Sequence, residues 1–116
     1  MMKRWDVVLL AYPFDDWTGA KVRPAVVISS DEYNRRSEDA IFVLITSNTG
    51  ARSADFDLLV ADDHPEFVRA GLAKSSMIRV DMIWTLKQML VKRTLGQAGD
   101  CIRREIAARL RRLLPD

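Results

Sequence analysis

Apolar residues in this chain of 116 residues come in short runs, and each run ends at polar, glycine or proline residues. Short runs with such boundaries are typical of β-strands. The first predicted strand covers residues 5–12 and ends before Pro13, and the second begins at about Pro24. Further strands are predicted over residues 40–47, 56–60 and 73–79, with shorter strand-like pieces over 82–86 and 91–95.

The second predicted strand carries an arginine at its start. Pro24 cannot donate to a sheet and favours an extended backbone at Arg23, so we expect the strand to begin there. The unbroken apolar run over 25–28 is typical of a strand covered on both faces. Such packing holds the neighbouring arginine rigidly, and phosphate chemistry requires rigid cations.

The end of the chain changes period. Residues 31–39 read as a charged connection, whereas Asp100 is placed to cap a helix that Pro115 ends. The apolar face of this helix consists of Ile102, Ile106, Leu110, Leu113 and Leu114. Short strands followed by one terminal helix predict a mainly β fold, a small antiparallel barrel with the helix packed on it, as a single domain over 1–116.

Composition narrows the class of protein without deciding its function. Apolar residues make up 48% of the chain, which argues against disorder, and the apolar runs are too short to span a membrane. No signal peptide is visible and Cys101 has no partner for a disulfide, so we expect a cytoplasmic protein. The net charge is +2, with seven Lys or Arg against three acids over residues 92–116. A solvated helix face explains that basic end as well as a nucleic-acid surface does.

Polar residues interrupt the apolar strands at a few points. Arg23 precedes the second strand, Thr46 and Ser47 end the third, and the fifth leads to Arg79 and Asp81. In an antiparallel sheet the start of one strand lies beside the end of its neighbour, so Arg23 and Thr46 share an edge if these strands pair. Arg79 and Asp81 are two residues apart and are expected on one face.

These points belong to a longer series of motifs that spans the chain. In order they are Asp6-Val7-Val8, Pro13-Phe14, Lys21-x-Arg23-Pro24-Ala25-x-Val27, Tyr33-Asn34, Ile45-Thr46-Ser47, Lys74-Ser75-Ser76, Arg79-x-Asp81 and Leu95-Gly96. The series resembles the MazF/PemK group of toxins from bacterial toxin–antitoxin pairs. Trp5 departs from the pattern, which usually has glycine there, and so does the loop before Arg23, which lacks the histidine of some relatives.

The resemblance implies a CcdB/MazF-like barrel of the SH3 type that works as a homodimer. It implies an endoribonuclease (mRNA interferase) that needs neither metal nor cofactor and cuts single-stranded mRNA at short sequences. The expected products are a 2′,3′-cyclic phosphate and a 5′-hydroxyl end, and the effect is to inhibit translation and growth. A cognate antitoxin with an acidic, flexible tail is the expected inhibitor.

The resemblance also implies site residues. Arg23 and Thr46 correspond to the usual catalytic pair, and in the PemK-like branch Arg79 and Asp81 contribute. The residues expected to bind RNA are Lys21, Trp17, Ser47, Lys74 and Ser76. Trp17 is included because exposed aromatic rings stack on unpaired bases, although it serves equally well as a hydrophobic anchor for its loop.

The chemistry of these residue types limits their roles. Attack by the RNA 2′-OH needs a base, an acid and a group that stabilises charge on phosphorus. His64 is the only histidine, so one chain cannot use two histidines. Arginine is a poor base and a good phosphate clamp, so Arg23 is expected to stabilise the pentacoordinate phosphorus. Thr46 would hold a phosphate oxygen or the 2′-OH, and Asp81, oriented by Arg79, is the best candidate for the base.

Structural explanations compete with these roles. Arg23 has Asp15 and Asp16 as possible ion-pair partners, and Thr46-Ser47 is also an ordinary strand exit. Arg79 and Asp81 are equally well explained as a surface ion pair.

Two further features favour a structural explanation. Asp62-Asp63-His64 suggests a metal site, but three adjacent residues of a regular strand cannot all face one ion, so we expect no metal. Cys101 is expected to fill a small buried apolar position.

Two other functions remain possible on the same fold. One is a CcdB-like gyrase poison without catalysis, although CcdB-like chains typically end Trp-Gly-Ile and this chain ends Leu114-Pro115-Asp116. The other is a barrel that binds RNA or a peptide and cuts nothing.

Overall fold

The computed structural model describes residues 2–12, 21–50 and 55–116, and its strands form one antiparallel six-stranded sheet in the order β4-β5-β3-β2-β1-β6. Three α-helices and one 3₁₀ turn accompany the sheet in the described residues. The strands are β1 Asp6–Tyr12, β2 Lys21–Val27, β3 Asp39–Thr46, β4 Asp57–Val60, β5 Ser76–Lys87 and β6 Val91–Gln97; the helices are α1 Asp31–Arg36, α2 Phe67–Ala70 and α3 Asp100–Leu113, with the turn η1 at Gln88–Leu90.

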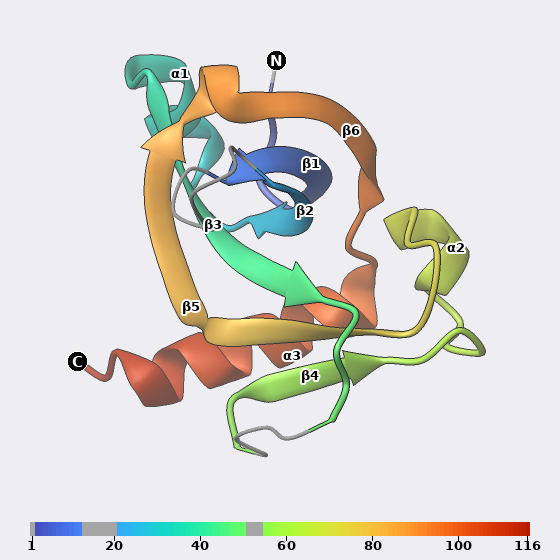
Figure 1. Cartoon of the computed structure of the whole chain (residues 1–116). Helices are drawn as coiled ribbons and strands as arrows, with labels where there is room; N and C mark the ends of the chain where they lie inside the picture. Colours follow the sequence, from blue (N-terminus) through green and yellow to red (C-terminus); the bar gives the residue numbers. More distant parts are fainter. Residues whose placement is uncertain (1, 13–20, 51–54) are drawn as a thin grey trace.

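The sheet curls strongly but does not close. Figure 1 shows β3, β5 and β6 wrapped around the β1–β2 pair, with α3 below them. In the part of the chain that the structure describes, β4 and β6 form the two edges and do not pair with each other. The predicted antiparallel sheet with a terminal helix is therefore confirmed, as a curled open sheet and not a closed barrel. None of the described helices has the length and apolar character needed to cross a membrane.

The strand alternation divides the core into two apolar clusters, one on each face of the sheet. Val7, Val26 and Val43 contribute to one cluster, and α3 covers it with Ile102 and Ile106. The neighbouring positions in the same strands face the other way, and their cluster comprises Val8, Leu10, Tyr12, Ala25, Val27, Ala40, Phe42 and Leu86. Because successive side chains of a strand point to opposite faces, the central strands are apolar on both sides.

Strand β2 begins before the predicted start at Pro24. It pairs with β1 from Lys21 onwards, with Leu9 opposite Pro24. Its pairing with β3 runs only from Ala25 to Val27. Proline is tolerated in a strand where one side is left without a partner, which explains why Pro24 does not end β2 here.

The two strand-like pieces predicted over 73–79 and 82–86 are one strand, β5, and residues 73–75 lie outside it. Against β3 its register shifts between Val43, opposite Ile83, and Leu44, opposite Arg79. The residues between Arg79 and Ile83 therefore form a bulge, and Figure 1 shows β5 bending. Sequence periodicity is interrupted at such a bulge, which is why the strand looked divided.

The charged connection predicted over 31–39 contains a helix, α1. The Ser30 hydroxyl accepts a hydrogen bond from the Tyr33 N–H and caps its first turn. Asp31 and Glu32 lie in that turn and Arg36 in the last, which suits the helix dipole. Helix α2 was also not predicted, because it is a single turn that ends at Gly71.

Helix α3 is capped differently from the prediction. Asp100 is its first residue, Gly99 holds the cap position and no side chain at that position makes the capping bond. The cap comes instead from Glu66: Oε2 accepts from the Cys101 N–H at 2.8 Å and Oε1 from the Ile102 N–H at 2.9 Å. A Cβ on Gly99 would lie 2.4 Å from Cδ of Glu66, so glycine is needed for this approach.

Trp5 stands where the resembled family has glycine, and its backbone explains the difference. Its φ is 75°, in the left-handed region that favours glycine. The indole packs against the cluster beneath α3, and the Arg4 guanidinium lies 4.5 Å from its ring centroid. Packing of the indole therefore offsets a backbone strain of about 1–2 kcal/mol.

Two substitutions separate that strain from the packing. Trp5→Ala and Trp5→Gly both remove the indole, so both are expected to lower the free energy of unfolding. Only alanine keeps the left-handed strain, so Trp5→Gly is expected to be about 1 kcal/mol more stable than Trp5→Ala. Urea denaturation of both variants measures the difference, and an alanine variant as stable as the glycine variant would contradict the strain.

The Glu66 cap predicts a pH dependence. Burial by itself raises the pKa of Glu66, but the hydrogen bonds from Cys101 and Ile102, with His64 and Arg69 nearby, outweigh it and lower the pKa below its ordinary value. A lowered folded-state pKa stabilises the protein above the ordinary glutamate range, and this contribution is lost as pH falls through the folded value.

Glu66→Gln is therefore expected to lower the free energy of unfolding by about 1 kcal/mol at neutral pH. Below the folded-state pKa of Glu66 the parent carries a neutral carboxyl as well, so the difference is expected to shrink on acidification. Denaturant melts at neutral and acidic pH measure both values. A difference that stays constant with pH would rule out the charged cap.

Candidate functional site

Two hollows in the surface meet at Arg23. The first, called the Thr46 cleft here, has a volume of about 260 Å³ and is lined by Tyr12, Arg23, Leu44, Thr46, Asn48, Arg79 and Met82. The second, called the Arg93 pocket, has a volume of about 340 Å³ and is lined by Leu9, Val22, Arg23, Pro24, Ile45, Ser47, Gly71, Leu72, Ala73, Lys74, Ser76, Arg93 and Leu95.

Strand pairing brings Arg23 and Thr46 together, as the sequence predicted. β2 and β3 pair antiparallel up to Ala25 opposite Leu44. If this register continued for two more residues, Arg23 would lie opposite Thr46, but the two strands no longer pair there. Both side chains line the Thr46 cleft, which opens where the two strands separate.

The Thr46 hydroxyl is oriented by its own loop. Its Oγ1 accepts a hydrogen bond from the Asn48 N–H at 3.1 Å, the local turn expected of a strand exit. A hydroxyl has one proton to donate as well as two lone pairs. The bond from Asn48 therefore leaves the Thr46 proton to be donated into the cleft.

Arg79 is held between two carboxylates. Its Nε lies 3.5 Å from Oδ1 of Asp57, and its Nη2 lies 3.6 Å from Oδ1 of Asp81. Asp57 faces Arg79 across the β4–β5 pairing, and its side chain is only 1% exposed. Asp81 is 33% exposed and lies in the β5 bulge. The predicted arrangement of Arg79 and Asp81 on one face is thus present, with a buried acid behind them.

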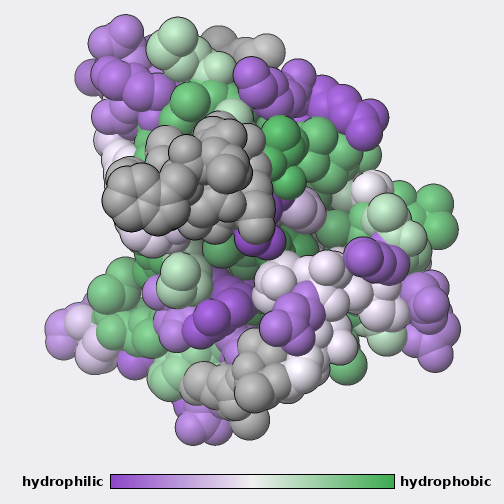
Figure 2. All heavy atoms as spheres, viewed as in Figure 1, coloured by the Kyte–Doolittle hydropathy of each residue, from purple (hydrophilic) through white to green (hydrophobic). Residues whose placement is uncertain are grey.

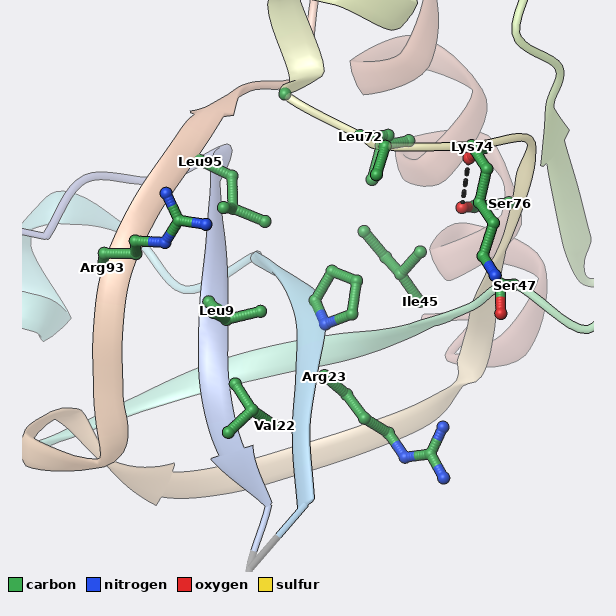
Figure 3. Close-up of a pocket in the computed structure, with 13 residues that line it drawn as sticks. Leu9, Val22, Arg23, Ile45, Ser47, Leu72, Lys74, Ser76, Arg93 and Leu95 are labelled. Atoms are coloured by element: carbon green, nitrogen blue, oxygen red, sulfur yellow. Dashed lines mark hydrogen bonds between the residues drawn. The ribbon is translucent and has the colours of Figure 1, made fainter.

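Three of the residues expected to bind RNA line the Arg93 pocket. Ser47 and Lys74 belong to them, and Lys74 is exposed. Ser76 is buried and donates its hydroxyl proton to the Lys74 carbonyl at 2.8 Å, which shapes the wall (Figure 3). Lys21 lies in β2 opposite Tyr12, while Trp17, Asp15 and Asp16 lie outside the described residues.

Sequence reasoning missed Asp57 and Arg93. Asp57 opens a short strand, and only its register opposite Arg79 reveals its role. Arg93 lies in the strand-like piece predicted over 91–95, and only its pairing with Leu9 places it at the pocket. Asn48 follows Thr46-Ser47 directly and could have been noticed as a turn-former.

The structure brings together a set of possible metal ligands that differs from the Asp62-Asp63-His64 set considered in the sequence. His64, Glu66 and Cys101 offer ligand atoms within 4.8 Å of one another. However, Nδ1 of His64 accepts the Glu66 N–H at 2.9 Å, and both Glu66 carboxylate oxygens accept from α3. Nδ1 of His64 and the Glu66 carboxylate oxygens therefore already stabilise the corner between α2 and α3. Cys101 is exposed, so its predicted burial was wrong, since it lies on the helix face away from Ile102 and Ile106.

The fold and the cleft together define a small curled-sheet protein with a cationic site at the separated ends of its central strands. The chain belongs to the family of PemK-like, MazF-like toxins of type II toxin–antitoxin systems, whose pattern it matches over residues 3–114. A comparison with curated protein sequences finds no match.

Solved structures share the fold at low sequence identity. A mycobacterial endoribonuclease in complex with its cognate antitoxin is 21% identical with a TM-score of 0.73, covering 100% of this chain and 99% of that one. MazF from Deinococcus radiodurans is 19% identical with a TM-score of 0.76, covering 99% and 97%. The Mycobacterium tuberculosis toxin MazF-mt6 is 15% identical with a TM-score of 0.71, covering 92% and 93%.

The Asp57–Arg79 contact predicts an energetic coupling. Arg79→Gln removes a cation that lies 3.5 Å from the buried Asp57 carboxylate, so it is expected to lower the free energy of unfolding by about 3 kcal/mol. In an Asp57→Asn background the same change is expected to cost at least about 1 kcal/mol less. Asp81→Asn, at the exposed pair, serves as the control and is expected to cost under about 1 kcal/mol. Equal costs of Arg79→Gln in both backgrounds would contradict the coupling.

Proposed function

We propose that this protein is a sequence-specific, metal-independent endoribonuclease toxin that cuts single-stranded mRNA. The observation that carries the proposal is that Arg23, Thr46 and Arg79 line one cleft in a member of the PemK-like, MazF-like family. The structural neighbours include proteins named as endoribonucleases, one of them bound to an antitoxin.

The proposed reaction is a transesterification within the RNA. The 2′ oxygen attacks the adjacent phosphorus, its bond to phosphorus forms and the bond from phosphorus to the 5′ oxygen breaks. The products are a 2′,3′-cyclic phosphate and a 5′-hydroxyl end. Asp81 accepts the 2′ proton, and the departing 5′ oxygen takes up a proton from water oriented by Arg23. The hydroxide left by that water takes the proton from Asp81, which restores the carboxylate.

The remaining groups either stabilise charge on the phosphate or hold the proposed base in place. The Arg23 guanidinium donates to the phosphate oxygens that gain charge in the transition state, and Thr46 donates its free proton to one of them. Arg79 holds the Asp81 carboxylate in place, and Asp57 fixes Arg79 from behind. Arginine suits both positions because its planar fork stays charged at any working pH.

The proposed partners follow from the positive charge of the two hollows. Arg23, Lys74 and Arg79 attract RNA phosphates, and they attract a carboxylate-rich antitoxin segment equally well. We propose that the protein acts as a homodimer in the cytoplasm, where mRNA is translated. We also propose that a cognate antitoxin inhibits it by covering these cations. MazE–MazF complexes are known among the structural neighbours.

The central test is cleavage of a long transcript by purified protein in excess EDTA. The parent is expected to cut, and Arg23→Ala is expected to cut about a hundredfold to a thousandfold more slowly because one preorganised donor is lost. Arg104→Ala is the matched control, since Arg104 is an exposed arginine on α3 that lines neither hollow.

Several outcomes would overturn the proposal. Arg23→Ala cutting as fast as the parent would remove the assigned clamp. Tight RNA binding without products would indicate a binding module, and inhibition of gyrase without RNA cleavage would indicate a CcdB-like poison. End-group analysis of the fragments distinguishes a cyclic phosphate from the 5′-phosphate product of metal-dependent nucleases.

A further inference from the structure

We propose that the Arg93 pocket is a nucleotide subsite: it holds one unpaired base of the RNA between apolar walls, and Arg93 binds the phosphate at its far end. The inference rests on the proposed function, because it places this nucleotide next to the phosphate that is cut at Arg23. It assigns a role to Arg93, which the catalytic arrangement leaves unused.

The pocket has the form of a small-molecule site. Its volume of about 340 Å³ is within the range of about 300–1,000 Å³ typical of such sites. Its apolar lining comes from Leu9, Val22, Pro24, Leu72 and Leu95, and Figure 3 shows Leu72 across the pocket from Leu9 and Val22. Val22, the second residue of β2, is 47% exposed, and burial of the strand begins only at Ala25. A flat aromatic base is the part of a nucleotide that apolar walls of this kind accept.

Cations lie at both ends of these walls. Figure 3 shows Arg93 on one side of Leu9 and Arg23 on the other, with Lys74 next to Ser76. Among the described residues that line the pocket, none is acidic. An anionic chain with an apolar group between its charges fits this pattern, and a nucleotide flanked by two phosphates is such a chain.

The β1–β6 pairing aims Arg93 at the pocket. Arg93 lies opposite Leu9, and the register shifts on both sides of this pair, between Val7 and Val8 and between Leu9 and Leu10. Bulges of this kind redirect side chains, and here both Arg93 and Leu95 line the pocket. Lys92, the preceding residue, is exposed and lines neither hollow.

The wall opposite β2 is held rigidly. Gly71 has a φ of +75°, and a Cβ there would lie 2.1 Å from the Leu95 carbonyl oxygen. A Cβ on Gly96 would lie 2.2 Å from the Arg69 carbonyl oxygen, so both glycines permit the end of α2 to lie directly on β6. The pocket is therefore formed before a ligand arrives, which lowers the entropic cost of binding.

RNA is favoured over an acidic peptide because the pocket continues into the Thr46 cleft. The two hollows share Arg23, and the consecutive residues Thr46 and Ser47 line one each. A single strand that presents its phosphate to Arg23 can thus place its neighbouring base in the Arg93 pocket. Figure 2 shows hydrophobic and hydrophilic side chains next to each other on the face of the molecule seen in Figure 1.

The test compares Arg93→Ala with Lys92→Ala, which remove the same charge from adjacent positions in β6. The probe is a single-stranded, fully 2′-O-methylated RNA of mixed sequence, which has no 2′-OH and cannot be cut. Arg93→Ala is expected to weaken RNA binding about fivefold or more. It is also expected to flatten, by about 0.7, the slope of the logarithm of the binding constant against the logarithm of the salt concentration. Lys92→Ala is expected to leave both near the parent values. Thermal melts establish that both variants are folded.

A third variant tests the apolar wall. Val22→Ser removes apolar contact without changing charge, so it is expected to weaken binding about threefold and leave the salt slope unchanged. Together with Arg93→Ala it distinguishes a base in the pocket from a phosphate that merely lies at its rim.

The outcomes separate this inference from the proposed function. Equal effects of Arg93→Ala and Lys92→Ala would overturn the subsite, and the function would stand if Arg23→Ala still slowed cleavage about a hundredfold or more. Binding that depends on Arg93 in a protein that cuts no transcript would support the subsite and overturn the function. If Arg93→Ala weakened binding of a poly-glutamate peptide but not of the RNA, the subsite would be overturned in favour of a peptide site.

Discussion

The separation of β2 from β3 beyond Ala25 and Leu44 is the constraint on which the site depends. Paired strands would bury their edges in hydrogen bonds and leave no cleft between Arg23 and Thr46. Pro24 has no N–H to donate, so it is compatible with the separation, while β1 keeps β2 in place along its whole length. The backbone that carries Arg23 is therefore fixed on one side and open on the other, which is what a rigid yet accessible cation requires.

Arg79, which lines the Thr46 cleft, joins a buried acid to an exposed one. Asp57 is almost fully buried, whereas Arg79 and Asp81 are each about one third exposed. A buried carboxylate requires a cation, and this requirement positions Arg79 without the help of any ligand. The outer carboxylate of Asp81 then meets an arginine whose position is already determined. As the proposed base, Asp81 would therefore lose little freedom when a substrate arrives.

The sequence predicts features that depend on neighbouring residues and misses those that depend on register. Alternation and punctuation sufficed for the core strands and α3, and antiparallel pairing alone placed Arg23 beside Thr46. The bulge in β5, the cap from Glu66 and the contact of Asp57 with Arg79 join segments whose alignment no local pattern encodes. Trp5 shows an intermediate case, because its departure from glycine was visible in the sequence while its left-handed backbone was not.

Recognition of an anionic strand by this protein depends on where its cations lie more than on their number. A net charge of +2 gives weak attraction at a distance, and salt screens it further. In the proposed function, Arg23, which is shared by both hollows, would act on the transition state in the Thr46 cleft and on the bound RNA in the Arg93 pocket. Arg93 lines only the pocket, so its proposed interaction would be the same in both states and would change binding without changing the chemical step. Under this proposal binding and catalysis are divided between the two hollows, and Arg23 is the residue through which an inhibitor would block both.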